Sequence, residues 1–269
     1  MATQAFDTSS PPAQPPAAVV PFDPTRKPGR DWKTAWAALR ELLANGDDTV
    51  QVFRIMRALN ADTGRRNYLK LLTSIQGGRL AYERVELSER FSDRAWLDAL
   101  PEDTVGATYR AFLDRTGFSA KGLAEVALTD FKAGDTPVRE VEHPYAWFGR
   151  RERDTHDIWH ALTGYTAEEH LGEACLVAFS YAQTGGLGWA AIAVGAAVKS
   201  YKQTGGTAVI KAIREGYRHG KAAKWLSGED YEALLAEPLD AARRRLNIQE
   251  PVLYKAAQAM LKARGIQAI

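Results

Sequence analysis

Residues 155–198 read THDIWHALTGYTAEEHLGEACLVAFSYAQTGGLGWAAIAVGAAV, and this stretch decides between a membrane protein and a helical globular one. From Ala174 to Val198 it has 25 residues without a charge, which is long enough for one membrane-spanning helix. Polar residues and glycines from Gln183 to Gly188 divide this segment into two pieces of about a dozen residues, each too short to span. We therefore expect two buried helices, with small residues after Trp189 allowing close packing. The alternatives are an apolar wall that contacts lipid or a membrane, and a true span.

Two histidines begin the same stretch. His156 and His160 are four residues apart, so a helix places them on one face about 6 Å apart. Two imidazoles at this spacing can share a metal ion, as in the zinc-protease helix motif. That motif has Glu after its first His, whereas this chain has Asp157, so the protease motif is not met. Asp157 lies about 100° around the helix. It is a candidate for a weaker ligand, for an acceptor that holds an imidazole tautomer, or for an acid/base.

A turn and a second helix follow the two histidines. Residues 163–165, Thr-Gly-Tyr, end the first helix, and Thr166 with Glu169 predicts a capping box that starts the next one. Glu173 then lies two turns into an antiparallel neighbour and can face the histidines. Two His and one carboxylate with open positions suit catalytic zinc and equally non-heme Fe(II). The alternative is a histidine pair on a polar surface that binds nothing.

Apolar residues at helical spacing account for most of the remaining chain. The predicted helices cover residues 31–46, 49–59, 63–78, 104–116, 119–128, 207–220, 229–246 and 251–264, the first capped by Asp31. Only residues 138–141 could form a short extended piece. The expected fold is all-α, a single multi-helix domain over residues 30–269 that contains the helix-turn-helix metal motif.

The N-terminal residues 1–29 have a different composition. Seven of the 12 prolines lie in residues 1–28, and residues 1–25 contain no Lys or Arg. We expect a disordered Pro-rich tail, without the charged region of a secretion signal or an Arg-rich transit helix. Over the whole chain 35 basic residues face 33 acidic ones, which argues against a nucleic-acid binder. The lone Cys175 excludes a disulfide framework and predicts an inert buried thiol.

The motif and its flanking blocks together resemble the ubiquinone (coenzyme Q) biosynthesis protein Coq-four family, in a bacterial-type member. The resemblance rests on the sequence from His156 through Glu173, on LPEDTVGATY at 100–109, on YRHGKAA at 217–223 and on 225–246, and it covers roughly residues 50–248. Twelve residues separate His160 from Glu173, where the family pattern has eleven. An extra residue in the turn is tolerable, whereas one within the helix would leave Glu169 as the substitute ligand.

The resemblance implies an all-helical fold and a divalent metal at His156, Asp157, His160 and Glu173. Zinc is the implied ion, with Fe(II) or Mn(II) possible. It also implies oxidative decarboxylation of a polyprenylated hydroxybenzoate, in which the C1 carboxyl is removed and that carbon is hydroxylated. We predict Asp157 as the catalytic residue of this step, because it can take a phenol proton or hold the His156 tautomer. Arginines before the motif helix, Arg150 and Arg151, are candidates for binding a substrate carboxylate; the alternative is a solvated charged turn.

The implied partners are a prenylated quinone precursor or another isoprenoid lipid, other coenzyme Q biosynthesis proteins, a membrane surface and a second copy in a homodimer. The expected location is the bacterial cytoplasm, peripheral on the inner face of the cytoplasmic membrane. Two other functions stay open. One is a non-catalytic scaffold that presents lipid to the biosynthetic complex. The other is a metal phosphohydrolase, suggested by the adjacent His156-Asp157 but lacking the further spaced ligands that such a site needs.

Overall fold

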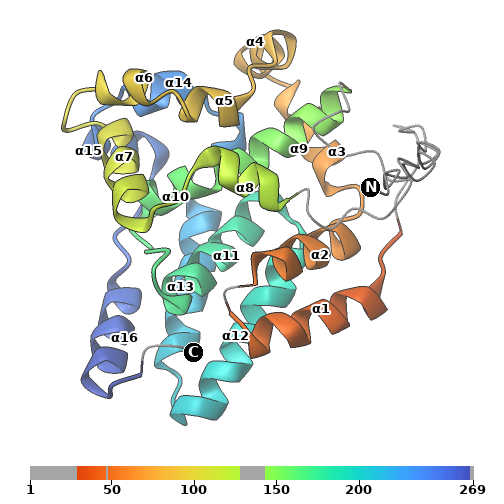
Figure 1. Cartoon of the computed structure of the whole chain (residues 1–269), viewed down its shortest axis with the longest axis vertical. Coiled ribbons are helices and arrows are strands. Elements are labelled where there is room, and N and C mark those ends of the chain that lie inside the picture. The colour runs from red at the N-terminus through yellow and green to blue at the C-terminus, as the bar shows by residue number, and fades with distance from the viewer. Residues whose placement is uncertain (1–28, 47, 128–142, 267–269) are drawn as a thin grey trace, which may run out of the picture.

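A computed structural model describes residues 29–46, 48–127 and 143–266, and these residues form a single helical domain (Figure 1). The helices are α1 (Trp32–Ala44), α2 (Thr49–Leu59), α3 (Thr63–Leu71), α4 (Ile75–Glu83), α5 (Leu87–Phe91), α6 (Arg94–Asp98), α7 (Val105–Thr116), α8 (Ala120–Val126), α9 (Pro144–Asp154), α10 (His156–Thr163), α11 (His170–Thr184), α12 (Leu187–Thr204), α13 (Ala208–Ala222), the 3₁₀ helix η2 (Leu226–Gly228), α14 (Tyr231–Leu235), α15 (Leu239–Leu246) and α16 (Val252–Ala263). No strand forms among the described residues, so the predicted all-α fold is confirmed. The predicted extended piece at 138–141 lies outside the described residues, as does all of the predicted tail except Gly29.

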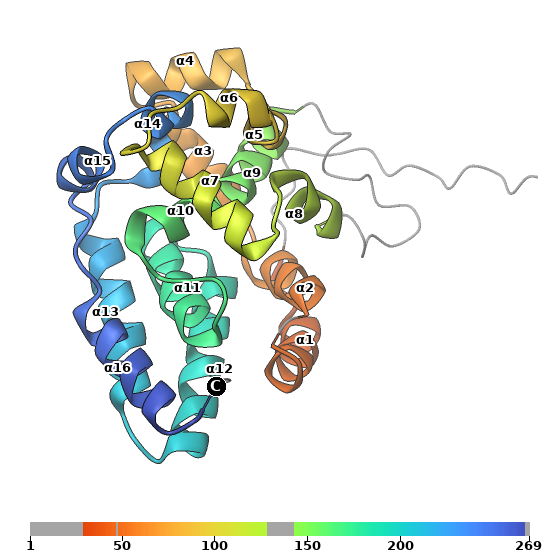
Figure 2. The ribbon, with the colours of Figure 1, turned by 60° about the vertical axis from the view of Figure 1, so that its left-hand side comes forward.

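Helix α11 lies in the middle of the lower half of the domain and packs closely on α13, with α12 and α16 beside this pair (Figure 2). Two glycines of α13 allow this close approach. A Cβ atom on Gly216 would lie 2.3 Å from the carbonyl oxygen of Cys175, and one on Gly220 would lie 2.5 Å from that of Phe179. Neither distance is possible for a real side chain, so the backbones of α11 and α13 meet directly. This contact fixes the position of α11, which carries Glu173.

The long uncharged segment divides as predicted. Helix α11 ends at Thr184, Gly185 adopts a positive φ of 73°, and α12 starts at Leu187. Most of α11 is buried in the core, whereas α12 packs one side against α1 and α2 and exposes Val194 and Val198 on another. Among the described residues, none of the helices has both the length and the apolar character that a bilayer crossing requires.

Helix α1 begins as predicted, because Asp31 accepts a hydrogen bond from the backbone N–H of Thr34. Its packing face differs from the predicted one. Ala35, Ala38, Leu39 and Leu42 are buried, whereas the two tryptophans that we placed in the same apolar pattern, Trp32 and Trp36, are 61% and 64% exposed. The small alanines allow α1 to lie close to its neighbours, which leaves the bulky indoles outside.

Two predicted helices are each divided in the structure. The helix predicted over 63–78 ends at Leu71, and Ser74 caps a new one by accepting from the N–H of Gly77. The helix predicted over 229–246 breaks before Pro238, which has no N–H to donate. Backbone hydrogen bonds to the segment before α7 hold the chain at this break. Leu239 N donates to Asp103 O at 2.8 Å, and Val105 N donates to Glu237 O at 2.9 Å.

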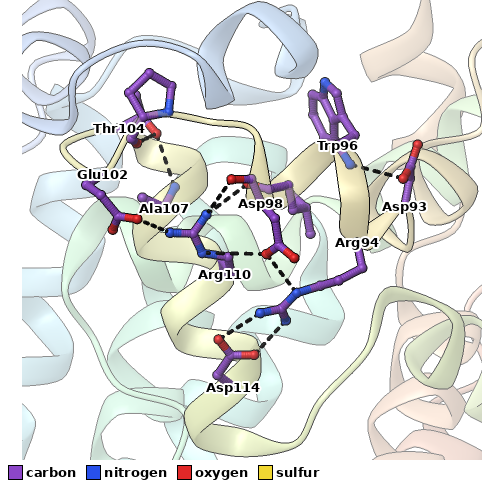
Figure 3. A network of polar contacts seen from close by, with 11 residues as sticks. Asp93, Arg94, Trp96, Asp98, Glu102, Thr104, Ala107, Arg110 and Asp114 are labelled. Carbon is purple, nitrogen blue, oxygen red and sulfur yellow. Dashed lines mark hydrogen bonds and ion pairs between the residues drawn. The ribbon is translucent and has the colours of Figure 1, made fainter.

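These last hydrogen bonds also position the start of α7, which packs against α10. Figure 3 shows the polar contacts that join α7 to α6 and to the loop between these two helices. Arg94 of α6 makes two hydrogen bonds to Asp114, at 2.6 and 3.0 Å. Arg110 donates to Glu102 at 2.7 Å and to the carbonyl of Leu97 at 3.1 Å. These contacts join α7 to α6 and to the loop between them, while α7 also packs on α10, the helix that carries the two histidines.

Candidate metal centre

The histidine pair lies on α10 with the predicted helical spacing. The ring centroids of His156 and His160 are 5.1 Å apart, with the planes at 79°. One ligand atom of each histidine and one of Asp157 lie within 4.8 Å of one another, close enough to share an ion. Asp157 and His160 are buried, whereas the side chain of His156 is 17% exposed. The cluster therefore lies at the edge of the core.

The orientation of His160 is set by the end of its own helix. Gly164, with φ 78°, ends α10 and turns the chain back, so that the carbonyl of Tyr165 lies 2.7 Å from Nδ1 of His160. A carbonyl can only accept a hydrogen bond, so Nδ1 carries the hydrogen and the lone pair of the neutral ring is on Nε2. The ring of Phe112 in α7 stacks on the imidazole of His160, with 5.6 Å between the centroids and 14° between the planes.

Glu173 faces this lone pair. Its Oε1 lies 3.2 Å from Nε2 of His160, and its side chain is 37% exposed. The second helix starts later than predicted, at His170, so Glu173 is in its first turn and not two turns in. The predicted capping box does not form, because Thr166 donates to the side chain of Glu169 and the helix begins after Glu169, without a side-chain cap.

Glu169, the alternative ligand, is directed elsewhere. Its Oε1 accepts hydrogen bonds from Thr166 and from the hydroxyl of Tyr254, both at 2.9 Å, and from the amide of Gln258. These contacts tie the loop before α11 to α16. The loop from Gly164 to Glu169 accommodates the twelve-residue spacing, and the structure brings Glu173, not Glu169, to His160.

The charges of the pair favour a cation between the two groups. Burial lowers the pKa of His160, but the carboxylates of Glu173 and Asp157 and the carbonyl of Tyr165 together outweigh burial, so the pKa is raised overall. Partial removal of the Glu173 carboxylate from water raises its pKa, but His160, and after it His156 and His170, bring the pKa below its usual value. Both pKa shifts show that an ionised Glu173 carboxylate and a positive charge at Nε2 of His160 stabilise each other. Either a proton or a metal ion can provide that positive charge.

The positions of the donor atoms are compatible with a metal ion. Nε2 of His160 is buried and, among the described residues, has no partner that meets hydrogen-bond geometry, although Glu173 is near. Two ligands at about 2.0–2.1 Å from one tetrahedral zinc ion lie about 3.3 Å apart. The observed 3.2 Å between Nε2 and Oε1 matches that separation. His160 and Glu173 are therefore spaced as two ligands of one divalent ion would be, and His160 also belongs to the cluster with His156 and Asp157.

His156 is held by two neighbours. Its Nδ1 lies 3.3 Å from Oδ1 of Asp157, which favours the tautomer with hydrogen on Nδ1 and leaves Nε2 for a ligand bond. Trp189 of α12 stacks on its ring at 5.7 Å, with the planes at 9°. Asp157 is thus placed to orient His156 and is also within the cluster that can hold an ion.

The two arginines predicted to bind substrate have protein partners. Arg150 forms an ion pair with Glu86, at 2.6 and 3.0 Å. Arg151 is 3% exposed, donates to the carbonyl of Glu229, and packs between Trp147 and Tyr231. These contacts join α9 to its neighbours, so a substrate role for either arginine stays a prediction. Cys175 is fully buried, which raises the pKa of its thiol, as expected for an inert cysteine.

Sequence reasoning did not find the residues that surround the histidines. Phe112 lies 48 positions before His160 on α7, and Trp189 lies 33 positions after His156 on α12. The block at 100–109 pointed to α7 through family resemblance, but its spacing gives no sign that α7 crosses the motif helix. Trp189 was counted only as the start of a packing segment.

Comparison with known proteins supports the resemblance. The model of the family described as "Coenzyme Q (ubiquinone) biosynthesis protein Coq4" matches residues 63–252. The chain is 28% identical over 206 residues to the mitochondrial ubiquinone biosynthesis protein COQ4 of Uncinocarpus reesii, covering 77% of this chain and 66% of that protein. It is 30% identical to the protein of the same name from Podospora anserina, covering 67% and 56%. The chain thus spans less than two thirds of the length of these two relatives.

A vertebrate relative and a solved structure agree. The mitochondrial COQ4 homolog of Danio rerio is 28% identical, with 73% of this chain and 70% of that protein covered. A crystal structure of a protein proposed to act in ubiquinone biosynthesis in Nostoc punctiforme superimposes with a TM-score of 0.58, covering 82% of this chain and all of that one. At 21% identity, this likeness shows a common helical fold.

Proposed function

The chain belongs to the Coq4 family of coenzyme Q (ubiquinone) biosynthesis proteins, and from that premise we propose that it is a metal-dependent enzyme of this pathway. The reaction is removal of the C1 carboxyl of a polyprenylated hydroxybenzoate as carbon dioxide, with hydroxylation of the same carbon. The observation that carries the proposal is the buried Nε2 of His160, which lacks a hydrogen-bond partner among the described residues and faces Glu173 at 3.2 Å.

The ligands in this proposal are His156, His160 and Glu173. When bound, a divalent ion supplies positive charge that stabilises carboxylate and phenolate oxygens, and a redox-active ion also supports dioxygen chemistry. Two neutral imidazoles and one carboxylate leave open positions for such oxygens. Zinc is the ion by family resemblance, with Fe(II) or Mn(II) as alternatives. Dioxygen and an electron donor come from outside the chain.

Asp157 is the proposed catalytic residue. Its Oδ1 lies 3.3 Å from Nδ1 of His156, so it can hold that imidazole in the tautomer with Nε2 available. Its carboxylate belongs to the same cluster of ligand atoms, where it can accept the proton of a substrate phenol. Taking the substrate proton needs a carboxylate and is lost in an amide, although the amide oxygen of Asn can still accept a hydrogen bond from Nδ1 of His156.

A lipid-facing surface complements the metal centre. Trp189, which stacks on His156, belongs to the same helix as the exposed Val194 and Val198. Helix α12 packs on α1, which exposes Trp32 and Trp36. We propose that the exposed side chains of Trp32, Trp36, Val194 and Val198, called here the α1–α12 surface, lie against a membrane. A substrate with a long isoprenoid tail resides in that membrane, and the protein is peripheral to it.

The test of the enzyme is direct. Purified protein, a divalent metal, dioxygen, a reductant and a prenylated hydroxybenzoate with a ¹³C-labelled carboxyl are expected to release labelled carbon dioxide. Asp157→Asn is expected to retain most of the metal and to lose turnover. Cells that lack the gene should accumulate a prenylated ring that still carries its carboxyl. Full quinone synthesis in cells with only the Asp157→Asn protein would contradict the catalytic role.

A scaffold that presents lipid to other pathway proteins is the second candidate, and the exposed α1–α12 surface favours it. A scaffold needs this surface but does not need Asp157 to carry a proton. Restoration of quinone synthesis by Asp157→Asn, with no carbon dioxide released by the purified wild-type protein, would establish the scaffold function instead.

A further inference from the structure

The hydroxyl of Tyr254 contacts the loop that joins the two helices of the candidate metal centre. Tyr254 is buried in the first turn of α16, 94 residues after His160. Its hydroxyl accepts a hydrogen bond from Thr166 N at 3.2 Å, lies 2.9 Å from Thr166 Oγ1, and donates to Oε1 of Glu169 at 2.9 Å. One hydroxyl of α16 therefore holds the loop near its start and at its end.

Gln258 completes this cluster, one turn further along α16. Its amide donates to Oε1 of Glu169 and to the hydroxyl of Tyr254, the latter at 3.3 Å. Glu169 directly precedes α11, which carries Glu173 in its first turn. The cluster thus connects α16 to the start of the helix with the candidate carboxylate ligand.

A single peptide group links Tyr254 to His160. The carbonyl of Tyr165 lies 2.7 Å from Nδ1 of His160, and the N–H of the same peptide group, which belongs to Thr166, donates to the Tyr254 hydroxyl. A trans peptide is planar, with its C=O and N–H on opposite sides, so a contact that fixes the N–H also fixes the direction of the carbonyl. The ring of Tyr165 meets that of Tyr254 edge to face, at 5.2 Å and 81°.

The start of α16 is itself fixed to α13. The carboxylate of Glu215, which is buried, accepts hydrogen bonds from Leu253 N at 2.9 Å and from Tyr254 N at 3.0 Å. The next residue is Gly216, through which α13 meets α11. The backbone of Tyr254 is therefore anchored to the same helix pair that positions α11, so its hydroxyl is a fixed point for the loop.

We propose that Tyr254 is a positioning residue of the candidate metal centre and acts through the peptide group between Tyr165 and Thr166. It fixes the plane of this peptide, whose carbonyl then keeps hydrogen on Nδ1 of His160 and leaves Nε2 for an ion. The inference rests on the proposed function, because it takes His160 as a metal ligand. It assigns a role to a residue that follows the matched family region, 63–252.

The test compares Tyr254→Phe with Leu261→Ala in the full chain. Phenylalanine keeps the buried ring and removes the hydroxyl, so the peptide can turn. Competition with a chelator for Zn²⁺ should show a loss of affinity of about tenfold, as for other groups that orient a metal ligand indirectly. Leu261 packs in the core about two turns further along α16. Leu261→Ala should lower the melting temperature at least as much and keep the Zn²⁺ affinity of wild type.

A conservative variant checks the same cluster. Glu169→Gln keeps an acceptor oxygen for the hydroxyl of Tyr254, so its Zn²⁺ affinity should match that of wild type. In the wild-type protein, Zn²⁺ should in turn slow hydrogen exchange at the Thr166 amide, because coupling between two sites is reciprocal.

A further measurement needs no metal. The ¹⁵N chemical shifts of the neutral His160 ring in the metal-free protein report which nitrogen carries hydrogen. Wild type should show hydrogen on Nδ1, and Tyr254→Phe a mixture of tautomers. Wild-type Zn²⁺ affinity and tautomer in Tyr254→Phe would overturn the proposal, as would an equal loss of affinity in Leu261→Ala. A wild type that binds no Zn²⁺ would refute the proposed function, and the tautomer comparison would still decide the role of Tyr254.

Discussion

Nε2 of His160 lies 3.2 Å from Oε1 of Glu173, although twelve residues and the end of one helix separate these two side chains in the sequence. The contact exists because Gly164 turns the chain and Gly172 lets α11 start close to the loop. A Cβ on Gly172 would lie 2.0 Å from the carbonyl oxygen of Thr166. The same turn directs the carbonyl of Tyr165 to Nδ1 of His160. The loop from Gly164 to Glu169 thus orients His160 and places Glu173 next to it.

The first prediction concerns the ligands. His160→Ala and Glu173→Gln are each expected to lower metal affinity by more than about 100-fold, because each removes a donor atom from a three-donor site. Elemental analysis of protein dialysed against a weak chelator, together with circular dichroism, measures metal content at constant helix content. Glu169→Gln is the control, since that carboxylate contacts Thr166, Tyr254 and Gln258. Equal metal content in wild type and His160→Ala would exclude the proposed ligand set.

The second prediction connects core packing with the site. Gly216→Ala should destabilise the protein by roughly 2–3 kcal/mol, because its Cβ would meet the Cys175 carbonyl and force α13 away from α11. Glu173 moves with α11, so metal affinity should fall as well. Gly149→Ala on α9 has nothing within 4 Å of the added Cβ and should be stabilising by about 0.5–1 kcal/mol. Urea unfolding of the two variants measures the difference, and similar stabilities would show that the helix pair is not packed as described.

The third prediction concerns pH. Burial raises the pKa of Glu152 to about 7, against hydrogen bonds from Asn67 and Ser227 that lower it. Between about pH 4.5 and 7 the native state therefore holds a proton that the unfolded chain releases, so this residue's contribution to the free energy of unfolding falls as pH rises and is constant above that range. Glu152→Gln keeps the acceptor for Asn67 and removes the titration. The free energy of unfolding of this variant should match that of wild type near pH 4.5 and exceed it at pH 8 by at most about 3 kcal/mol.

Urea titrations at several pH values measure this difference, with Glu125→Gln as the exposed control. A constant stability difference between wild type and Glu152→Gln from pH 4.5 to 8 would show that Glu152 does not titrate in this range. A difference that grows toward low pH would contradict the sign of the shift.

Local patterns predicted the parts of the site that lie close together in sequence. His156 and His160 share a helix face by their spacing, and the Gly164 turn was visible in the sequence. The start of α11 was misplaced, because Thr166 and Glu169 hydrogen bond to each other and to Tyr254 of α16 instead of capping the helix. A capping pattern has no information about a partner more than 80 residues away in the chain.

The surroundings of the site and the outer face of α1 depend on tertiary packing. Helical spacing places Trp32 and Trp36 near the apolar stripe of α1, but it cannot tell whether the neighbouring helix has room for indoles or only for the methyl groups of alanines. Likewise, nothing local to Phe112 or Trp189 states which helix each ring will meet. Such contacts are set by the crossing of α7 and α12 with α10, which follows from the whole core.

The last prediction concerns the α1–α12 surface and the membrane. Trp32 and Trp36 expose large aromatic side chains on α1, with Lys33 and Arg40 also exposed on that helix. Tryptophan prefers the boundary between lipid headgroups and acyl chains, and basic side chains are attracted to anionic headgroups. Simultaneous replacement by Trp32→Ser and Trp36→Ser should weaken binding to vesicles that contain anionic lipid by roughly tenfold or more.

The control for this experiment is on the far end of the molecule (Figure 1), where α4 exposes Ile75 and Tyr82 even more fully, at 96% and 87%. Replacing Ile75→Ser and Tyr82→Ser removes a comparable apolar area and should leave vesicle binding unchanged. Sedimentation with vesicles measures both double variants, and added salt should release the wild type in part because basic residues contribute. If the α4 variant loses binding and the α1 variant keeps it, the membrane lies against α4, and the proposed approach of the substrate to Trp189 and the candidate metal centre from the α1–α12 surface is wrong.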